Sequence, residues 1–206
     1  MMKPTILWNG GTPMRDNALR AQKQALRRLC AEKRAAMTPQ FLFAASESIA
    51  RRVSSSEAFC QAEGIFSYVS LPNEPDTRAL IELAWAKGKR VYVPRCRGKG
   101  LMEAVAVSSW QDLLPGALGI LEPREEILSE PSPAISLALV PCVCAGLDGR
   151  RLGHGAGYYD RFLKFHPTAK ICLCFHALLF PDIPMDAQDV WMDAVVTENG
   201  WFQRKK

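Results

Sequence analysis

Residues 137–161 read LALVPCVCAGLDGRRLGHGAGYYDR, and this stretch decides the fold. Its first four residues form a continuous apolar run, which is typical of a parallel strand covered by helices on both faces. Further along, Gly153, Gly155 and Gly157 stand at every second position and precede a helix-like pattern. A strand that leads through a glycine loop into a helix is a common anion-binding element of open α/β proteins. The stretch therefore predicts a parallel α/β sheet with a phosphate site.

The glycine spacing has a physical meaning. Without a Cβ in the way, successive backbone N–H groups can converge on one anion, and a helix that begins at the last glycine adds its unpaired amides. The spacing fits neither common motif, because a Walker loop would end in Lys followed by Ser or Thr, and a dinucleotide fingerprint would need Gly at the position of Tyr158. By themselves the glycines are equally compatible with a tight strand-to-helix turn.

Strand-like and helix-like patterns alternate around this stretch. The predicted fold is α/β, a mainly parallel open sheet flanked by helices in three Rossmann-like layers, with an N-terminal helical segment, all within one domain over residues 15–200. Residues 108–135 contain four prolines and are expected to form an irregular surface excursion. The expected strands are 65–70, 90–93, 102–107, 137–142, 170–175 and 194–197, and the expected helices are 15–36, 38–53, a short piece at 55–61, 76–87 and one after Gly157.

The first predicted helix carries the whole excess of positive charge. The chain has 26 Lys and Arg against 21 Asp and Glu, and residues 15–34 hold seven basic and two acidic residues, which leaves 19 of each elsewhere. Lys23 and Arg27 stand four residues apart, so they share a helix face and can grip one polyphosphate. A solvated face is the alternative, and nucleic-acid binding is only weakly supported. The expected apolar stripe of this helix consists of Leu19, Leu26, Leu29 and Cys30.

Carboxylates stand at three places suited to ligand binding. Asp160 lies in the first turn after the glycine loop, where it either caps the helix or holds a cation beside phosphates. Asp189 belongs to a late acidic segment, in which we expect Asp186 and Asp193 to lie in a solvated turn. Mg²⁺ takes one or two protein carboxylates besides water and phosphate oxygens, so one acid from each segment suffices. Glu74, bracketed by prolines, suits a carboxylate that reads substrate N–H groups.

We expect loops 70–75 and 142–157 to border one crevice. Both follow predicted strands, and ligands of open α/β sheets bind beyond the carboxyl ends of the strands. Tyr158 and Tyr159 are open to two interpretations, stacking on a flat heterocycle or packing into the core, and consecutive positions cannot both do the same.

Composition indicates a protein of the aqueous cytoplasm. No run approaches the ~18 apolar residues of a membrane-spanning helix, and the start lacks the features of a secretory signal, although it mildly resembles an organelle transit peptide. The seven cysteines include Cys142 with Cys144 and Cys172 with Cys174, each pair within a strand-like run. We interpret them as reduced core residues rather than as metal ligands or disulfides.

A set of motifs then points to a known family. They occur in order from about residue 20 to 198, and the glycine-tyrosine block is the most specific of them. Together they closely resemble the 5-formyltetrahydrofolate cyclo-ligase family, also called methenyltetrahydrofolate synthetases. The motifs are Lys23-x-x-Leu26-Arg27, Asn73-Glu74-x-Asp76-Thr77, Gly119-Ile120-x-Glu122-Pro123, Val140-Pro141, Asp148-x-x-x-Arg151-Leu152-Gly153-x-Gly155-x-Gly157-Tyr158-Tyr159-Asp160-Arg161, and Asp189-x-x-x-Asp193-x-Val195-x-Thr197.

The resemblance implies an ATP- and Mg²⁺-dependent cyclisation of 5-formyltetrahydrofolate to 5,10-methenyltetrahydrofolate, with release of ADP and phosphate through a phosphorylated formyl group. It implies that Glu74, His154 and Tyr158 contact the folate and that Asp160 and Asp189 hold Mg²⁺ directly or through water. A monomer without nucleic-acid or membrane partners is expected. The implied ATP-binding residues are Lys23, Arg27, Arg151, Leu152, Gly153, His154, Gly155, Ala156, Gly157, Tyr158 and Tyr159.

The chain also departs from the family pattern. Ala156 stands where a glycine or lysine is often found, so Lys23, Arg27 or His154 must compensate if relatives use a cation there to stabilise the transferred phosphoryl group. Residues 142–146 also differ from the usual family sequence, and this difference bears on the contacts expected in the folate pocket. Two alternatives stay open, another ATP-using enzyme that acts on a different pterin or amide, and a non-catalytic protein that binds folate or nucleic acid.

Overall fold

A seven-stranded sheet forms the centre of the computed structural model, which describes residues 13–98, 100–116, 119–130 and 133–205. The strand order is β11-β10-β9-β6-β1-β2-β3. The five central strands, from β10 to β2, are parallel, and the edge strands β3 and β11 run antiparallel to their neighbours. The strands are β1 (Gly64–Ser67), β2 (Arg90–Cys96), β3 (Met102–Val107), β6 (Leu137–Pro141), β9 (Ala169–Leu173), β10 (Ala194–Thr197) and β11 (Gly200–Gln203).

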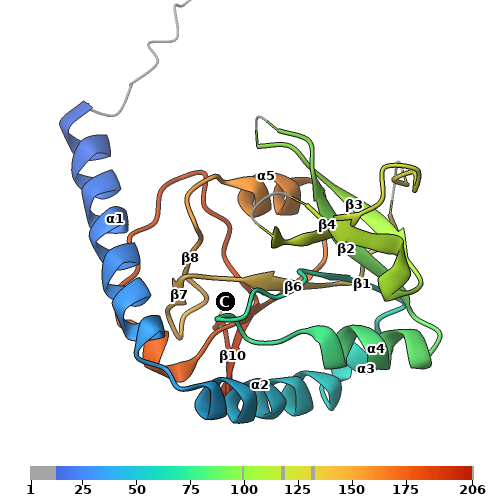
Figure 1. The fold of residues 1–206 in the computed structure, drawn as a ribbon. Helices are drawn as coiled ribbons and strands as arrows, with labels where there is room; N and C mark the ends of the chain where they lie inside the picture. Colours follow the sequence, from blue (N-terminus) through green and yellow to red (C-terminus); the bar gives the residue numbers. More distant parts are fainter. Residues whose placement is uncertain (1–12, 99, 117–118, 131–132, 206) are drawn as a thin grey trace, which may run out of the picture.

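Helices cover both faces of this sheet, which confirms the predicted three layers (Figure 1). In that view α2, α3 and α4 lie below the sheet, and α5 lies above it, where Phe162 stacks on Phe66 of β1 with ring centroids 4.5 Å apart. The long helix α1 stands across one end of the sheet. The helices are α1 (Pro13–Ala35), α2 (Pro39–Ser54), α3 (Glu57–Gln61), α4 (Arg78–Ala86) and α5 (Tyr158–Phe165).

The central strand β6 is buried along its whole length, as its unbroken apolar sequence predicts. Its residue Leu139 pairs with Ser67 of β1 on one side and with Ile171 of β9 on the other. Burying a leucine side chain contributes about 1.5–3 kcal/mol. The thiols of 142, 144, 172 and 174 are free and buried beside this strand, as predicted for core cysteines.

The predicted stripe of α1 is wrong in one respect. Leu29 is 42% exposed, whereas Lys23, Cys30 and Arg34 of the same helix are buried. The reason is that α1 lies against loops rather than against the apolar face of the sheet, and loops offer carbonyl and carboxylate oxygens to basic side chains.

The fold also contains short elements that were not predicted from the sequence. The excursion 108–135 contains the turn η1 (Trp110–Asp112) and a hairpin of β4 (Leu113–Pro115) and β5 (Leu121–Pro123), and the short turn η3 (His176–Leu178) follows β9. Another hairpin, of β7 (Cys144–Ala145) and β8 (Arg151–Leu152), leads directly into the glycine loop. Within the described residues, no helix combines the length and apolarity needed to cross a bilayer.

Candidate active site

The candidate site lies at the carboxyl ends of the parallel strands. There the loop after β1, the β7–β8 hairpin with the glycine loop, and the segment 181–193 come together, and α1 stands beside them (Figure 1). The contacts that join these segments span up to 166 residues of sequence. The two loops predicted to border one crevice, 70–75 and 142–157, therefore lie in contact, with Glu74 Oε1 3.5 Å from His154 Nε2.

The glycine loop has the backbone that its sequence predicts. Gly155 has a φ of +107° and Gly157 a φ of +69°, both in the region that L side chains rarely adopt. Gly157 is the N-cap residue of α5, so the loop ends where the unpaired amides of a helix begin. The structure thus shows a tight turn at Gly155 and Gly157 that ends at the amino end of a helix.

Arg27 of α1 lies on this loop. Its Nε donates a hydrogen bond to the carbonyl oxygen of Gly153 at 2.9 Å. A Cβ added to Gly155 would come within 3.2 Å of the Arg27 guanidinium carbon, so a side chain there would displace this cation. Arg27 and the glycine loop together form one cationic wall of the crevice.

Lys23, one turn earlier, is held by two carboxylates. Its Nζ lies 2.8 Å from Asp186 Oδ2 and 2.5 Å from Asp189 Oδ2, and only 11% of the lysine side chain is exposed. Burial lowers the pKa of Lys23, but its hydrogen bonds to both aspartates, together with their charges, outweigh burial and leave the pKa above its ordinary value. Burial raises the pKa of Asp186, but the hydrogen bonds from Lys23 and from the backbone N–H groups of Gln188 and Asp189 together lower it below its ordinary value, so Lys23 and Asp186 form a charged pair at neutral pH.

Asp160 has a structural partner beneath the loop. Its Oδ1 accepts hydrogen bonds from Arg151 Nη2 at 2.8 Å and from the backbone N–H of Val190 at 3.1 Å. Asp160 therefore lies against the residue that follows Asp189. The Arg151 side chain is 2% exposed and also donates to the carbonyl of Pro141 at 3.1 Å. Leu152 is buried as well, so both residues support the loop from below.

Glu74 and His154 face each other across the crevice. Glu74 Oε1 lies 3.5 Å from His154 Nε2, and Glu74 is 7% exposed whereas the His154 side chain is 63% exposed. The other oxygen of Glu74 accepts from the N–H of Leu71 at 3.1 Å, which fixes the carboxylate in its loop. The buried acid thus presents one oxygen toward the glycine loop.

The two tyrosines after the loop take different positions. Tyr159 packs inward against Phe66, with centroids 6.2 Å apart, and lies over the Arg151 guanidinium. Burial, together with the charge of Glu74, raises the pKa of Tyr159, so its hydroxyl stays protonated. Tyr158 remains half-buried beside Arg161. Both residues are partly exposed, and they differ in their contacts, since Tyr159 packs on the core and Tyr158 lies beside Arg161.

Sequence reasoning missed Arg34. This residue of α1 is 8% exposed, and its guanidinium donates to the carbonyls of Asn73 at 3.3 Å, Cys142 at 2.5 Å and Val143 at 3.1 Å. Arg34 joins the two loops that border the crevice. The available signal was its spacing, since 23, 27, 30 and 34 follow the 4-3-4 pattern of a single helix face.

The carboxylates suit a magnesium ion that is bound mainly through phosphate and water. Asp160 and Asp189 each use one oxygen in the contacts above, and no hydrogen bond within the described residues engages the other. No cluster of three or more His, Cys, Asp or Glu that could hold a metal occurs in that part of the chain. Mg²⁺ prefers oxygen ligands and takes only a few of them from the protein, so these two carboxylates beside the glycine loop would suit it.

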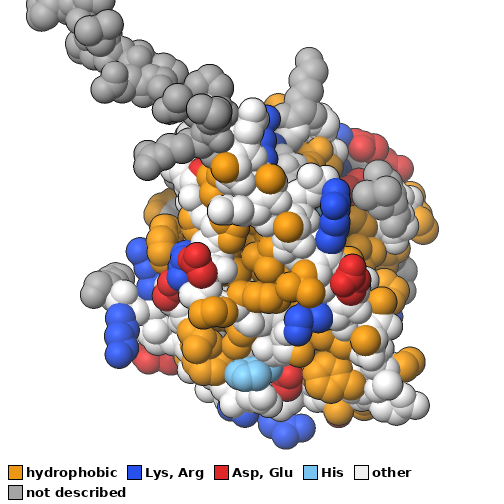
Figure 2. Space-filling view, turned by 90° about the vertical axis from the view of Figure 1, so that its left-hand side faces the viewer, with side chains coloured by type: hydrophobic (Ala, Val, Ile, Leu, Met, Phe, Trp, Pro, Cys, Tyr) orange, Lys and Arg blue, Asp and Glu red, His pale blue; other side chains and the backbone are white. Residues whose placement is uncertain are grey.

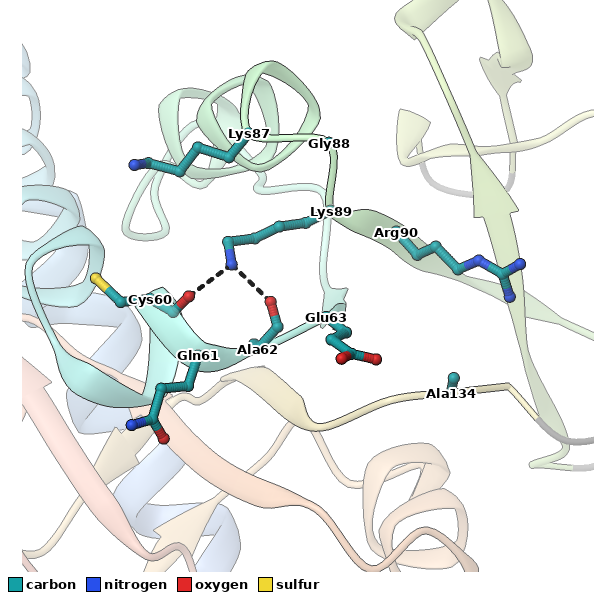
Figure 3. Close-up of a pocket in the computed structure, with 9 residues that line it drawn as sticks. All are labelled: Cys60, Gln61, Ala62, Glu63, Lys87, Gly88, Lys89, Arg90 and Ala134. Atoms are coloured by element: carbon teal, nitrogen blue, oxygen red, sulfur yellow. Dashed lines mark hydrogen bonds between the residues drawn. The ribbon is translucent and has the colours of Figure 1, made fainter.

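The surface around the site is of mixed charge. Figure 2 looks at the face that α1 crosses and shows apolar side chains in its middle, with acidic and basic side chains side by side around them. A cavity of about 630 Å³ lies elsewhere, near the amino ends of β1 and β2 (Figure 3). There Lys89 Nζ donates to the carbonyls of Cys60 at 2.9 Å and Ala62 at 2.6 Å. This lysine therefore caps the carboxyl end of α3. None of the predicted site residues lines this cavity.

The fold and the site define an α/β protein with a glycine loop at the carboxyl edge of its sheet, where basic side chains of α1 meet carboxylates from the loop segments. The family model of the 5-formyltetrahydrofolate cyclo-ligase family matches residues 19–198. The chain belongs to this family and is an enzyme of its class, as the motifs predict.

Known relatives agree along most of the chain. A probable 5-formyltetrahydrofolate cyclo-ligase of Schizosaccharomyces pombe is 30% identical over 193 residues, which cover 85% of this chain and 95% of that protein. The Mus musculus 5-formyltetrahydrofolate cyclo-ligase is 31% identical, with 88% and 92% covered. The NMR structure of Aquifex aeolicus 5,10-methenyltetrahydrofolate synthetase superposes with a TM-score of 0.80 at 29% identity, with 89% of this chain and 93% of that chain covered.

Proposed function

We propose that this enzyme converts 5-formyltetrahydrofolate to 5,10-methenyltetrahydrofolate in a reaction driven by ATP and dependent on Mg²⁺. The observation that carries the proposal is the meeting of Arg27 with the glycine loop, beside the paired Lys23 and Asp189. Backbone amides and cations suit the phosphates of ATP, and the carboxylates suit the metal that ATP carries. Next to them lies Glu74, a buried acid that suits a heterocycle with N–H groups.

The triphosphate would lie along the glycine loop. Gly155 and Gly157 turn the backbone, and the first amides of α5 add partial positive charge. Arg27 supplies a planar fork and Lys23 a point charge for neighbouring phosphate oxygens. Asp160 and Asp189 would hold Mg²⁺, which neutralises phosphate charge when bound. Arg151 and Leu152 then act from beneath, by fixing the loop, rather than through contact with the nucleotide.

The chemistry needs positioning more than a protein nucleophile. A formamide carbonyl is a poor electrophile, so its oxygen attacks the γ-phosphorus, the bond from that phosphorus to the bridging oxygen breaks, and ADP leaves. N10 then attacks the activated formyl carbon and gives up its proton, and phosphate departs with the electrons of the carbon–oxygen bond. This ring closure is intramolecular, and good orientation alone can lower such a barrier by ~7–11 kcal/mol.

Glu74 is the residue that we assign to the pterin. Its loop is fixed by the hydrogen bond to Leu71 and by Arg34, so the carboxylate is held before substrate arrives. His154 lies 3.5 Å away on the glycine loop, between this acid and the phosphates, and Tyr158 beside it stays accessible. This arrangement brings the formyl oxygen and the terminal phosphate to the same residue, His154.

The test follows the near-ultraviolet absorbance of the methenyl product together with ADP release. Both signals should require 5-formyltetrahydrofolate, ATP and Mg²⁺, and omission of any one should abolish both. ADP release that this folate does not stimulate would favour an enzyme that acts on another pterin or amide. Folate binding without any ATP turnover would refute the catalytic proposal.

A further inference from the structure

The ion cluster of Lys23, Asp186 and Asp189 goes beyond what the reaction requires. One cation and two anions give the cluster a net charge of −1, and Arg27 brings the group of four to zero. The neighbouring Arg151 and Asp160 cancel each other. These groups of opposite charge together add nothing to the site's net charge, and the lysine expected to bind a polyphosphate is already shared by two carboxylates.

The extra acid is Asp186. Family resemblance assigns phosphate to Lys23 and metal to Asp189, but nothing assigns a role to Asp186, which sequence reasoning placed in a solvated turn. Instead, its Oδ2 lies 2.8 Å from Lys23 Nζ, and its Oδ1 accepts the N–H of Gln188 at 2.7 Å. Its own N–H donates to Asp189 Oδ2 at 2.8 Å, so Asp186 holds both Lys23 and Asp189 in place.

We propose that Asp186 is a counter-charge that makes nucleotide binding conditional on magnesium. This inference rests on the proposed function. Without metal, the two carboxylates beside Lys23 repel an incoming triphosphate and compete with it for the ammonium group. A divalent cation bound by Asp189 would weaken the attraction of that carboxylate for Lys23 and would make the local charge positive. Lys23 then pairs with phosphate while Asp186 keeps it in position.

The consequence is a coupling between two ligands. Each ligand should bind better once the other has weakened the ion pair between Lys23 and Asp189. Mg²⁺ must then raise the affinity for ATP by the same factor by which ATP raises the affinity for Mg²⁺. The part of this factor that arises from Asp186 should disappear when its charge is removed. Metal-free nucleotide would then bind more tightly, whereas the magnesium complex would change little.

The experiment compares Asp186→Asn with the wild-type chain by isothermal titration calorimetry of ATP, in EDTA and in excess Mg²⁺. Asparagine keeps the Oδ1 acceptor for Gln188 and removes only the charge. We expect metal-free ATP to bind about tenfold more tightly to the variant, the order of effect for one like charge a few ångströms away when water screens it, as it does at the half-exposed Asp186. The affinity for the magnesium complex should change less than about twofold, and the coupling factor should fall accordingly.

A matched control is Asp182→Asn. Asp182 lies in the same segment and carries the same charge, but it is 85% exposed and pairs with Arg150. This variant should leave both affinities unchanged, which excludes a bulk charge effect. Asp186 itself is 42% exposed, so its variant should fold, and Asp186→Ser provides a second uncharged side chain.

The outcomes separate this inference from the proposed function. If the wild-type chain binds ATP with Mg²⁺ but Asp186→Asn binds metal-free ATP no better than wild type, the counter-charge role is refuted and the proposed function stands. If the wild-type chain does not bind ATP in either condition, both fail. Tighter metal-free binding in both Asp186 variants, with Asp182→Asn unchanged, supports the role.

Discussion

Asp160→Asn should damage the fold as well as the metal site. Removing this carboxylate leaves the Arg151 guanidinium, whose side chain is 2% exposed, without its counter-charge. Breaking a buried ion pair by removing one partner costs about 3–5 kcal/mol. Asp160 is itself 17% exposed, and an asparagine oxygen still accepts from Arg151 and Val190, so we expect a loss at or just below the lower limit of this range, about 2–3 kcal/mol.

The loss can be measured by urea unfolding, followed by both tryptophan fluorescence and circular dichroism. With a slope of about 2 kcal/mol per molar urea, the midpoint should fall by about 1–1.5 M. Asp189→Asn is the matched control, because Lys23 retains Asp186 as a partner and the expected loss stays below about 1 kcal/mol. Turnover and its dependence on Mg²⁺ should fall sharply in both variants.

A double variant distinguishes the charge from the contact. If the uncompensated guanidinium is the cause, then Arg151→Met combined with Asp160→Asn should be more stable than the sum of the two single losses predicts. An unchanged midpoint in Asp160→Asn would contradict the argument from burial. Simple additivity in the double variant would show that the pair contributes little, and Asp160 would then act only through the ligand.

The remaining predictions concern the walls of the crevice. Gly155→Ala forces a side chain into a φ of +107° and toward the Arg27 guanidinium, so we expect a cost of about 1–3 kcal/mol in stability and a KM for ATP that rises more than the KM for folate. Glu74→Gln should raise the KM for 5-formyltetrahydrofolate about tenfold and that for ATP by less than twofold, and equal changes would remove Glu74 from the folate site. Arg34→Met should lower the unfolding free energy by about 2 kcal/mol, because three carbonyls lose their donor, and it should raise the KM for folate, whereas a purely global effect would change thermal stability alone.

Local signals allowed much of this structure to be predicted. The buried strand β6, the turn at Gly155 and Gly157 and the helix α2, expected over 38–53, each depend on residues within a few positions of one another. The edge strand β11 was missed, although Asn199-Gly200 between two apolar runs is a strong hairpin signal. Patterns that repeat over a few residues are visible in a sequence because the structures they specify are local.

In most of the contacts that were not predicted, one partner is a backbone atom. Arg34 donates to carbonyls 39 and 108 residues away, and Arg27 to a carbonyl 126 residues away. Every residue carries such a carbonyl, so no letter in the sequence marks the acceptor. The pairing of Lys23 with Asp186 escaped for a related reason, because an aspartate in an irregular loop has no periodic neighbours that indicate the direction of its side chain.

These contacts also explain why we assign α1 to the proposed active site rather than to the scaffold. Its exposed Leu29 and its buried Lys23 and Arg34 show that polar bonds to the crevice loops supply much of its attachment. Groups that a nucleotide would bind are thus the same groups that fix the helix in the unbound chain. Ligand binding must replace those bonds without releasing the helix. Arg34, which bonds to loops on the folate side, can keep α1 in place while Lys23 changes its partner.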